Sequence, residues 1–149
     1  METIVRYSDE LKDRVFGFTD KCFREIGKVF EPEGRHYFYN NIEEEFDAFW
    51  CLLSEGEVVG TVAVKPFDKK SSELKALYLS QEMRGKGYGL RLLDMAVEFS
   101  EEKGYERIVL DSMSIYKDAL KLYERYGFTH IERYNDNPYA DIFMEYRFG

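Results

Sequence analysis

The sequence has little cysteine, little proline and no long hydrophobic run. Cys22 and Cys51 are the only cysteines among 149 residues, and one pair without CxxC spacing excludes a disulfide framework and argues against a zinc site. We expect both to be buried thiols of a reducing compartment, so no metal is predicted and a cytoplasmic location is favoured. No window approaches about 18 apolar residues, and the first residues lack the apolar core of a signal peptide, so no membrane span is predicted.

Positive charge is also scarce. Lys and Arg number 21 against 29 Asp and Glu, which gives a formal net charge of −8. Such a surface repels nucleic acid and anionic lipid at long range and favours neutral or cationic partners. Apolar residues make up 44% of the chain, enough for a real core, and no repeat, low-complexity tract or linker interrupts it. The sequence therefore predicts one domain over residues 1–149.

The hydrophobic pattern predicts an α/β fold with a mixed sheet. Strands are expected at 3–7, 48–53, 58–65, 73–79, 107–112, 128–134 and 140–148. Helices are expected from the N-cap Ser8 to about Val29, over 41–46, from the glycine-rich segment to about Lys103, and over 117–125. Gly104 and Gly127 should end the last two helices in the left-handed conformation. Hairpins come first and crossover helices later, which is typical of this class.

The segment MRGKGYGLRLL, residues 83–93, places three glycines between a strand and a helix. The first amides of a helix have no partner inside it, and together with the helix dipole they favour an anion. Glycines let those amides approach a ligand without clashes from Cβ atoms. Arg84 and Lys86 add positive charge in an otherwise acidic chain. Residues 84–89 are therefore predicted to hold a diphosphate group.

Other glycine-rich sites fit the segment less well. A Rossmann fingerprint needs a third glycine where Leu90 stands, and a P-loop needs a Lys-Ser/Thr pair that is missing here. A GxGxG segment of the kind found in SAM-dependent methyltransferases does match the glycines, and Asp111 could then hold a ribose. That cofactor carries no phosphate, however, so Arg84 and Lys86 suit it poorly, and the chain is short for the sheet of such enzymes.

With its flanks included, the segment resembles the GNAT superfamily of acetyl-CoA-dependent N-acetyltransferases, whose signature is R/Q-x-x-G-x-G/A between a strand and a helix. The signature corresponds to Arg84, Gly85, Lys86, Gly87, Tyr88 and Gly89. A second segment, DALKLYERYGF, is similar to the family's A-x-x-L-Y-x-x-x-G-F motif through Ala119, Leu122, Tyr123, Gly127 and Phe128. The resemblance covers the order of elements in the whole chain and is specific from about residue 73 to residue 128.

The resemblance implies a GNAT fold, with about seven mostly antiparallel strands and with the fourth and fifth strands splayed apart. It implies that the amides of residues 84–89 hold the diphosphate of acetyl-CoA. Main-chain groups of Leu77, Tyr78 and Leu79 would bind the pantetheine arm and the thioester carbonyl. Many members have an Asn that contacts the cofactor where this chain has Tyr116, so that contact is in doubt here.

The resemblance also implies the catalytic groups. Tyr123 stands at the family's general-acid position, where it would protonate the departing thiolate. Glu73 matches a catalytic Glu of the histone-acetylating branch and is a candidate base, with a chain of waters as the alternative. On a regular strand, residues 73, 75, 77 and 79 would share one face.

The region before the second strand is expected to wall the acceptor pocket. Its candidate residues are Arg35, His36, Tyr37 and Tyr39, with Asp111 and the loop of residues 134–138 as further candidates. His130 is expected on the surface of a strand. The predicted activity is acetyl transfer to a primary amine of a small molecule, with no nucleic-acid or membrane partner. A homodimer, a SAM-dependent methyltransferase and a non-catalytic CoA-binding module on the same fold stay open.

Overall fold

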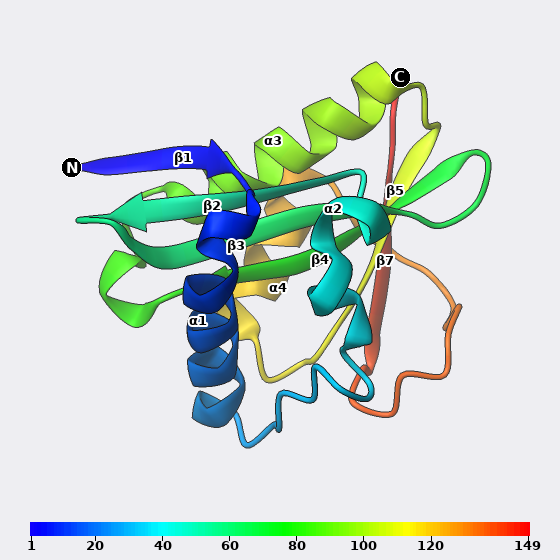
Figure 1. Cartoon of the computed structure of the whole chain (residues 1–149). Helices are drawn as coiled ribbons and strands as arrows, with labels where there is room; N and C mark the ends of the chain where they lie inside the picture. Colours follow the sequence, from blue (N-terminus) through cyan, green and yellow to red (C-terminus); the bar gives the residue numbers. More distant parts are fainter.

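The elements follow one another as the sequence predicts, in a computed structural model that describes all 149 residues (Figure 1). In chain order they are β1 (Glu2–Arg6), the 3-10 turn η1 (Asp9–Leu11), α1 (Lys12–Glu25), η2 (Tyr37–Asn41), α2 (Ile42–Glu45), β2 (Ala48–Ser54), β3 (Glu57–Pro66), β4 (Ser71–Leu79), η3 (Gln81–Met83), α3 (Tyr88–Lys103), β5 (Arg107–Ser112), α4 (Lys117–Tyr126), β6 (Thr129–His130) and β7 (Ile142–Arg147).

All the strands form one sheet in the order β1-β2-β3-β4-β5-β7-β6. Every neighbouring pair is antiparallel except β4 and β5, which are parallel. The tight turn between β2 and β3 has Glu55 and Gly56 at φ +51° and +78°, the backbone that closes a two-residue hairpin. The predicted mixed, mostly antiparallel sheet of about seven strands is confirmed.

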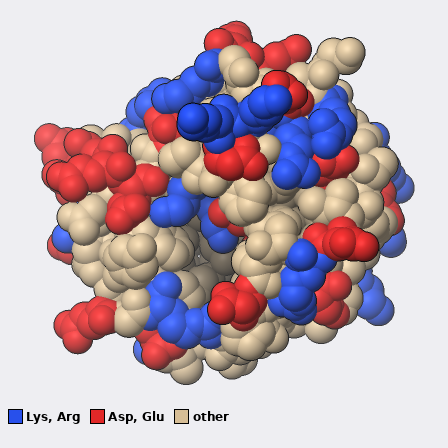
Figure 2. Space-filling model, turned by 90° about the vertical axis from the view of Figure 1, so that its right-hand side faces the viewer, with Lys and Arg blue, Asp and Glu red and all other residues tan.

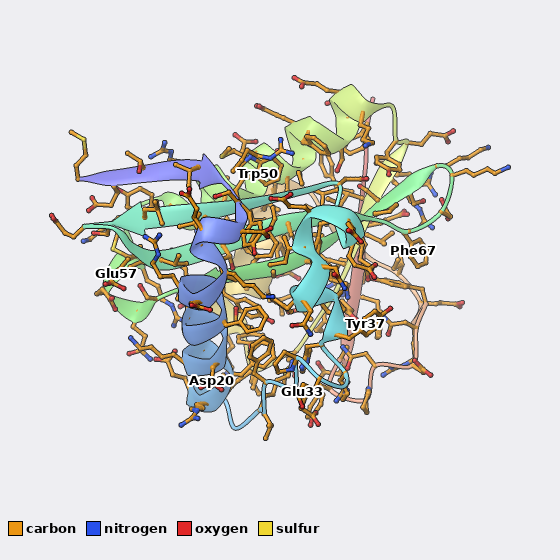
Figure 3. The ribbon with its side chains drawn as sticks, viewed as in Figure 1. Asp20, Glu33, Tyr37, Trp50, Glu57 and Phe67 are labelled. Atoms are coloured by element: carbon orange, nitrogen blue, oxygen red, sulfur yellow. The ribbon has the colours of Figure 1, made fainter.

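Helices cover both faces of this sheet (Figure 1). On one side α3 and α4 pack on the sheet through a buried cluster that includes Trp50, Val62 and Leu93; on the other side α1 and α2 cover a second cluster that includes Phe18 and Ala63. Because β2 and β3 are buried on both faces, their sequences are almost continuously apolar. Trp50, labelled in Figure 3, meets Phe99 of α3 edge-on at 5.6 Å between the ring centroids.

The first helix differs from its prediction at both ends. Ser8 makes no side-chain capping hydrogen bond, and a 3-10 turn precedes α1. The helix ends at Glu25 because Gly27, at φ +77°, turns the chain, and the Lys28 N–H donates back to the Phe23 carbonyl. Val29, predicted on the apolar face, is 68% exposed.

The strand predicted over 128–134 is also shorter than expected. Thr129 and His130 pair with β7, the Ile131 N–H still donates to the Phe143 carbonyl at 2.8 Å, and the chain then leaves the sheet. The Arg133 guanidinium donates to the carbonyl oxygens of Asn135, Asn137 and Ala140 at 3.3, 3.1 and 2.7 Å. These bonds fold the segment into a loop, which alternation of apolar residues could not reveal. His130 is exposed, as predicted.

A bulge in β4 overturns the expectation that residues 73, 75, 77 and 79 share one face. Ala76 has φ +56°, and the register with β3 shifts between Lys75 and Tyr78. Leu77 and Leu79 therefore pack on the α3–α4 side, while Ala76 and Tyr78 pack on the α1 side.

Both cysteines are buried free thiols, as expected. None of the helices combines the length and the apolar character that crossing a bilayer would need.

The αL caps of α3 and α4 differ in the space around them, which yields a stability prediction. Gly127 has φ +118°, and an added Cβ would lie 3.1 Å from Cε1 of Tyr146; Gly104 has φ +101° and open space. Gly104→Ala should cost about 1–3 kcal/mol from backbone strain alone. Gly127→Ala should cost at least about 1 kcal/mol more, because Tyr146 must also move. Urea denaturation of both variants measures the difference, and equal losses would contradict a tight contact at Tyr146.

Candidate active site

The two central strands separate soon after they begin. β4 pairs with β5 only through Ser71, Ser72 and Glu73, opposite residues 107–109. Beyond this point β4 stays with β3 as far as Leu79, and β5 stays with β7 as far as Ser112. A cavity of about 1420 Å³ is lined by the diverging segments 74–79 and 110–113. The splay expected between the fourth and fifth strands is present.

This cavity has two ends that the chain builds from distant segments. The first, the glycine end, comprises residues 84–90, which precede α3 and form its first turn, and all of them but Lys86 and Tyr88 line the cavity. The second, the loop end, comprises lining residues of 28–39, which follow α1, and of 135–140, which lie between β6 and β7. Figure 2 shows a hollow near the centre of the face at the right of Figure 1, with side chains of both charges around it.

The glycine end presents a run of backbone donors without partners in the protein. Gly85 and Gly87 have φ +77° and +85°, which turn the chain so that α3 begins at Tyr88. No acceptor in the protein receives the N–H groups of residues 85–90, and the first helical bond comes from the Arg91 N–H to the Gly87 carbonyl. Six successive free amides at a helix N-terminus form a site suited to an anion.

The backbone amide of Arg84 and the side chains of Arg84 and Tyr88 have partners within the protein. The Arg84 amide donates to the Gln81 carbonyl at 3.2 Å, so it does not belong to the free set. The Arg84 guanidinium donates to the Leu79 carbonyl at 3.4 Å. The Tyr88 hydroxyl donates to Glu2 Oε1 at 3.2 Å, which directs that ring toward β1. Lys86 is exposed.

Leu77, Tyr78 and Leu79, predicted to meet the cofactor through their main chain, all line the cavity. The Leu77 and Leu79 side chains point into the α3–α4 core, and the Tyr78 ring packs on Phe23 at 5.5 Å between centroids. Their side chains are therefore committed to packing, which leaves only their backbone groups for a ligand.

Two tyrosines, one in α4 and one at its N-cap, line the same cavity. Tyr123 is 5% exposed and lines the cavity, its ring packs on Phe128 at 5.7 Å, and its hydroxyl makes no hydrogen bond within the protein. Burial raises the pKa of Tyr123, so the phenol keeps its proton throughout the neutral range. Tyr116, the N-cap of α4, also lines the cavity, and its buried hydroxyl has no partner. Burial raises the pKa of Tyr116 to about 12.

The candidate base Glu73 lies behind the cavity wall rather than on its surface. Its carboxylate, 7% exposed as a residue, accepts a hydrogen bond from the Tyr134 hydroxyl at 2.7 Å and lies 3.4 Å from Lys75 Nζ. Phe67, labelled in Figure 3, packs on Tyr134 at 4.9 Å. Burial, together with the Glu73 charge, raises the pKa of Tyr134, which therefore stays protonated.

Asp111, unlike Glu73, lines the cavity. Its Oδ2 accepts bonds from the side-chain amides of Asn135 and Asn137 at 2.7 and 3.2 Å, and its Oδ1 lies 3.9 Å from Lys75 Nζ. The sequence analysis missed Lys75 and Lys28, both of which line the cavity. No local pattern marks either residue: burial does not alternate along β4, and Lys28 follows the end of α1.

The structure brings some of the residues predicted to wall the acceptor pocket to the cavity. Arg35, His36 and Tyr39 line the cavity, whereas Tyr37 is 56% exposed and does not. His36 Nδ1 accepts the Glu31 N–H at 3.0 Å, and its ring packs on Phe23 at 5.1 Å. Burial, with the nearby cations Lys28, Arg35 and Lys75, lowers the pKa of His36 to about 4. At neutral pH the imidazole is uncharged.

Known proteins with similar sequences point to one family. A model described as the acetyltransferase (GNAT) family matches residues 12–128. The uncharacterised N-acetyltransferase YjgM of Escherichia coli is 39% identical over 88 residues, which cover 57% of this chain and 53% of that protein. N-acetyltransferase 8B of Homo sapiens is 36% identical over 85 residues, which cover 54% and 37%. The chain therefore spans about half or less of the length of these curated relatives.

Solved structures confirm the fold. An acetyltransferase of the GNAT family from Staphylococcus aureus Mu50 has a TM-score of 0.90 at 20% identity, with 99% of each chain covered. The PaiA N-acetyltransferase from Thermoplasma acidophilum, solved in complex with coenzyme A, has a TM-score of 0.77 at 18% identity, again with 99% of each chain covered.

The packing of His36 generates a prediction about stability and pH. The unfolded chain binds this proton near pH 6.5, but the folded chain binds it only near pH 4. Stability is therefore complete above pH 6.5 and falls as the pH drops toward 4. Between pH 7.5 and 5 the loss should be roughly 1 kcal/mol after allowance for partial exposure.

The matched variant is His36→Asn, which keeps an acceptor for the Glu31 N–H and cannot titrate in this range. Its unfolding free energy, measured in urea at both pH values, should fall by less than that of the unaltered protein. An identical fall in the two proteins would show that His36 does not control this pH dependence.

Proposed function

The chain belongs to the acetyltransferase (GNAT) family, and from that membership we propose that it transfers the acetyl group of acetyl-CoA to a primary amine of a small acceptor. The observation that carries the proposal is the run of six unpartnered amides at residues 85–90, at the edge of the cavity between β4 and β5. The Thermoplasma acidophilum neighbour, which binds coenzyme A, adds support.

The residues present suit the diphosphate of coenzyme A. Donors at a helix N-terminus stabilise negative charge through hydrogen bonds and through the helix dipole. Gly85 and Gly87 supply positive φ values and leave open space where a Cβ would stand, so a phosphate can approach the backbone. Arg84 and Lys86, both exposed, add local positive charge to an acidic protein.

The gap between the strands suits the pantetheine arm. Beyond Glu73 the edge of β4 that faces β5 has no partner strand, so an extended ligand can pair with the main chain of residues 77–79. Backbone N–H groups on this edge would hold the thioester carbonyl and stabilise negative charge on its oxygen. The Tyr116 hydroxyl, buried without a partner, is a further donor to the arm.

Tyr123 is proposed as the general acid. Acetyl-CoA supplies the acetyl group: a bond forms from the amine nitrogen to the carbonyl carbon, and the carbon–sulfur bond breaks. The departing thiolate belongs to a thiol of pKa roughly 8–9, so a proton donor assists its departure. The free hydroxyl of Tyr123 in the cavity can give that proton and regain one from solvent. Its raised pKa keeps it protonated until it is needed.

The proton of the attacking amine leaves by water, with Glu73 as a more distant acceptor. Glu73 does not line the cavity, and Tyr134 and Lys75 occupy its carboxylate, so any role as a base runs through an intervening water. The family assignment leaves the methyltransferase alternative without support. A non-catalytic CoA-binding module would bind acetyl-CoA without releasing CoA when amines are added, which a thiol-release assay measures.

The first functional prediction concerns the glycine end. Gly87→Ala should weaken acetyl-CoA binding about tenfold, because alanine disfavours φ +85° and relaxation turns the neighbouring amides away from the phosphates. Gly104→Ala, at φ +101° at the other end of α3, is the matched control and should keep the affinity. Isothermal titration calorimetry measures both. Equal affinities in the two variants would show that these amides do not bind acetyl-CoA.

The second functional prediction concerns the acid. Tyr123→Phe should lower kcat by about 100-fold and leave acetyl-CoA affinity nearly unchanged, since only the proton donor is lost. The control is Tyr126→Phe on the same helix, which removes a hydroxyl that bonds Asp94 away from the cavity. CoA release with an accepted amine gives kcat from pH 6 to 9. Full turnover by Tyr123→Phe across that range would show that Tyr123 is not the general acid.

A further inference from the structure

The loop end of the cavity contains a cation with no anionic partner. The Lys28 Nζ lies 4.4 Å from the centroid of Phe23 and 5.1 Å from that of Tyr139, between two aromatic rings. The residue is partly buried and lines the cavity. No carboxylate oxygen lies within 4.0 Å of this ammonium group, and it makes no hydrogen bond in the protein. A desolvated charge without a counterion is costly, so its presence calls for an explanation.

Arg35 adds a second cation at the same place. Its guanidinium carbon lies 4.6 Å from the centroid of Tyr139, the ring that Lys28 also approaches. Its only hydrogen bond runs to Asn137 Oδ1, at 3.3 Å, and it too has no carboxylate within 4.0 Å. Most of its five N–H donors are therefore free. Because His36 Nδ1 accepts the Glu31 N–H, Nε2 carries the ring proton and is a further donor beside them.

The acids of the cavity wall do not neutralise these cations. Asp111 is engaged by Asn135 and Asn137 and lies near Lys75, while Glu73, behind the wall, pairs with Lys75 and Tyr134. Asp136 also lines the loop end, but its carboxylate lies more than 4.0 Å from the charged nitrogens of Lys28 and Arg35. Lys75 thus has two carboxylates, and Lys28 and Arg35 have none. The loop end is locally positive although the whole chain has a net charge of −8.

The phosphates of coenzyme A do not explain this charge, because they belong at the other end of the cavity. Arg35 contacts Asn137 and Tyr139 of the β6–β7 connection, whereas the free amides lie after the C-terminal end of β4. In Figure 1 the connection that follows α1 and the orange β6–β7 connection come near each other at the lower right, while η3, which follows β4, lies at the left.

We infer that the acceptor amine carries an anionic group, a carboxylate as in an amino acid, and that Lys28 and Arg35 bind this group at the loop end. The inference rests on the proposed function and names its substrate class. The rings of Phe23 and Tyr139 hold the two cations in place, and the Nε2–H of His36 donates to the same anion. Asp111, which lines the same cavity and is held by Asn135 and Asn137, can attract the ammonium end of the acceptor.

The binding arrangement predicts a specific preference. An amino acid should be a better acceptor than its primary amide or its decarboxylated amine, because only the acid has the charge that the two cations lack. A polyamine should be a poor acceptor, since it would add positive charge beside Lys28 and Arg35. The long-range attraction of the acidic surface for cations does not decide this, because the pocket contacts are local.

The first experiment measures CoA release with matched acceptors. One set is phenylalanine, phenylalaninamide and phenethylamine; a second is β-alanine, O-phosphoethanolamine and ethanolamine; spermidine is the cationic probe. Phenylalanine should exceed phenylalaninamide and phenethylamine in kcat/KM by at least about tenfold, as one strong charge-assisted contact would give. β-Alanine should exceed ethanolamine, which has no anionic group, by a similar factor. The second set tells a carboxylate from a phosphate.

The second experiment uses variants at the loop end. Lys28→Gln and Arg35→Gln should each raise KM for the acid about tenfold, with little change for the amide, and Lys28→Arg should restore part of the loss. Lys21→Gln is the matched control, an exposed lysine on α1 outside the cavity. Calorimetry adds a measurement that needs no turnover. CoA-saturated protein should bind N-acetylphenylalanine more tightly than its amide, and the double variant should lose that difference.

The outcomes separate this inference from the proposed function. If acetyl-CoA binds and amides or spermidine are acetylated as well as the acids, acetyl transfer stands and the anionic acceptor is wrong. Equal binding of N-acetylphenylalanine and its amide, or binding of neither at millimolar concentration, also overturns it. If acetyl-CoA does not bind and no amine is accepted, the proposed function fails, and the inference fails with it.

Discussion

The separation of β4 from β5 after Glu73 is the constraint on which the rest of the structure depends. Each strand keeps its outer partner, β3 or β7, so the sheet holds together while a gap opens at its centre. The bulge at Ala76 adds a local twist to β4 within this gap. Backbone groups that a continuous sheet would consume are left for a ligand, and both proposed ends of the site adjoin this gap.

α3, whose N-terminus lies at the edge of the gap, is positioned by its packing on the sheet and not by a ligand. Leu92, Leu93 and Ala96 are fully buried between α3 and the sheet, which fixes where the helix begins. The amides before them then point away from any protein acceptor, with solvent as their only partner in the free protein. The packing stabilises a prearranged donor set, so little ordering is needed when an anion binds.

The loop end, in contrast to the glycine end, is assembled from two segments that are distant in the chain. A hydrogen bond at 3.3 Å joins these segments between Arg35 and Asn137, which are 102 residues apart. Aromatic rings hold Lys28 and Arg35 in place of carboxylates, which leaves the positive charge available. An acidic surface is compatible with the proposed anion site, because contacts in the pocket are local and salt screens the more distant surface charges.

Local pattern was sufficient for what depends on local chemistry. Alternation and helical periodicity determined most of the elements, and Gly104 and Gly127 determined two helix ends. The spacing of Gly85, Gly87 and Gly89 located the run of free amides at the start of α3, since helix starts and left-handed turns depend on neighbouring residues. Only the tertiary structure decided the short β6, the change of face at Ala76, the placement of Glu73 behind Lys75, and the meeting of Lys28 with Tyr139. Those features depend on contacts between segments far apart in the chain, and no pattern within a short window encodes which side chains will share a pocket.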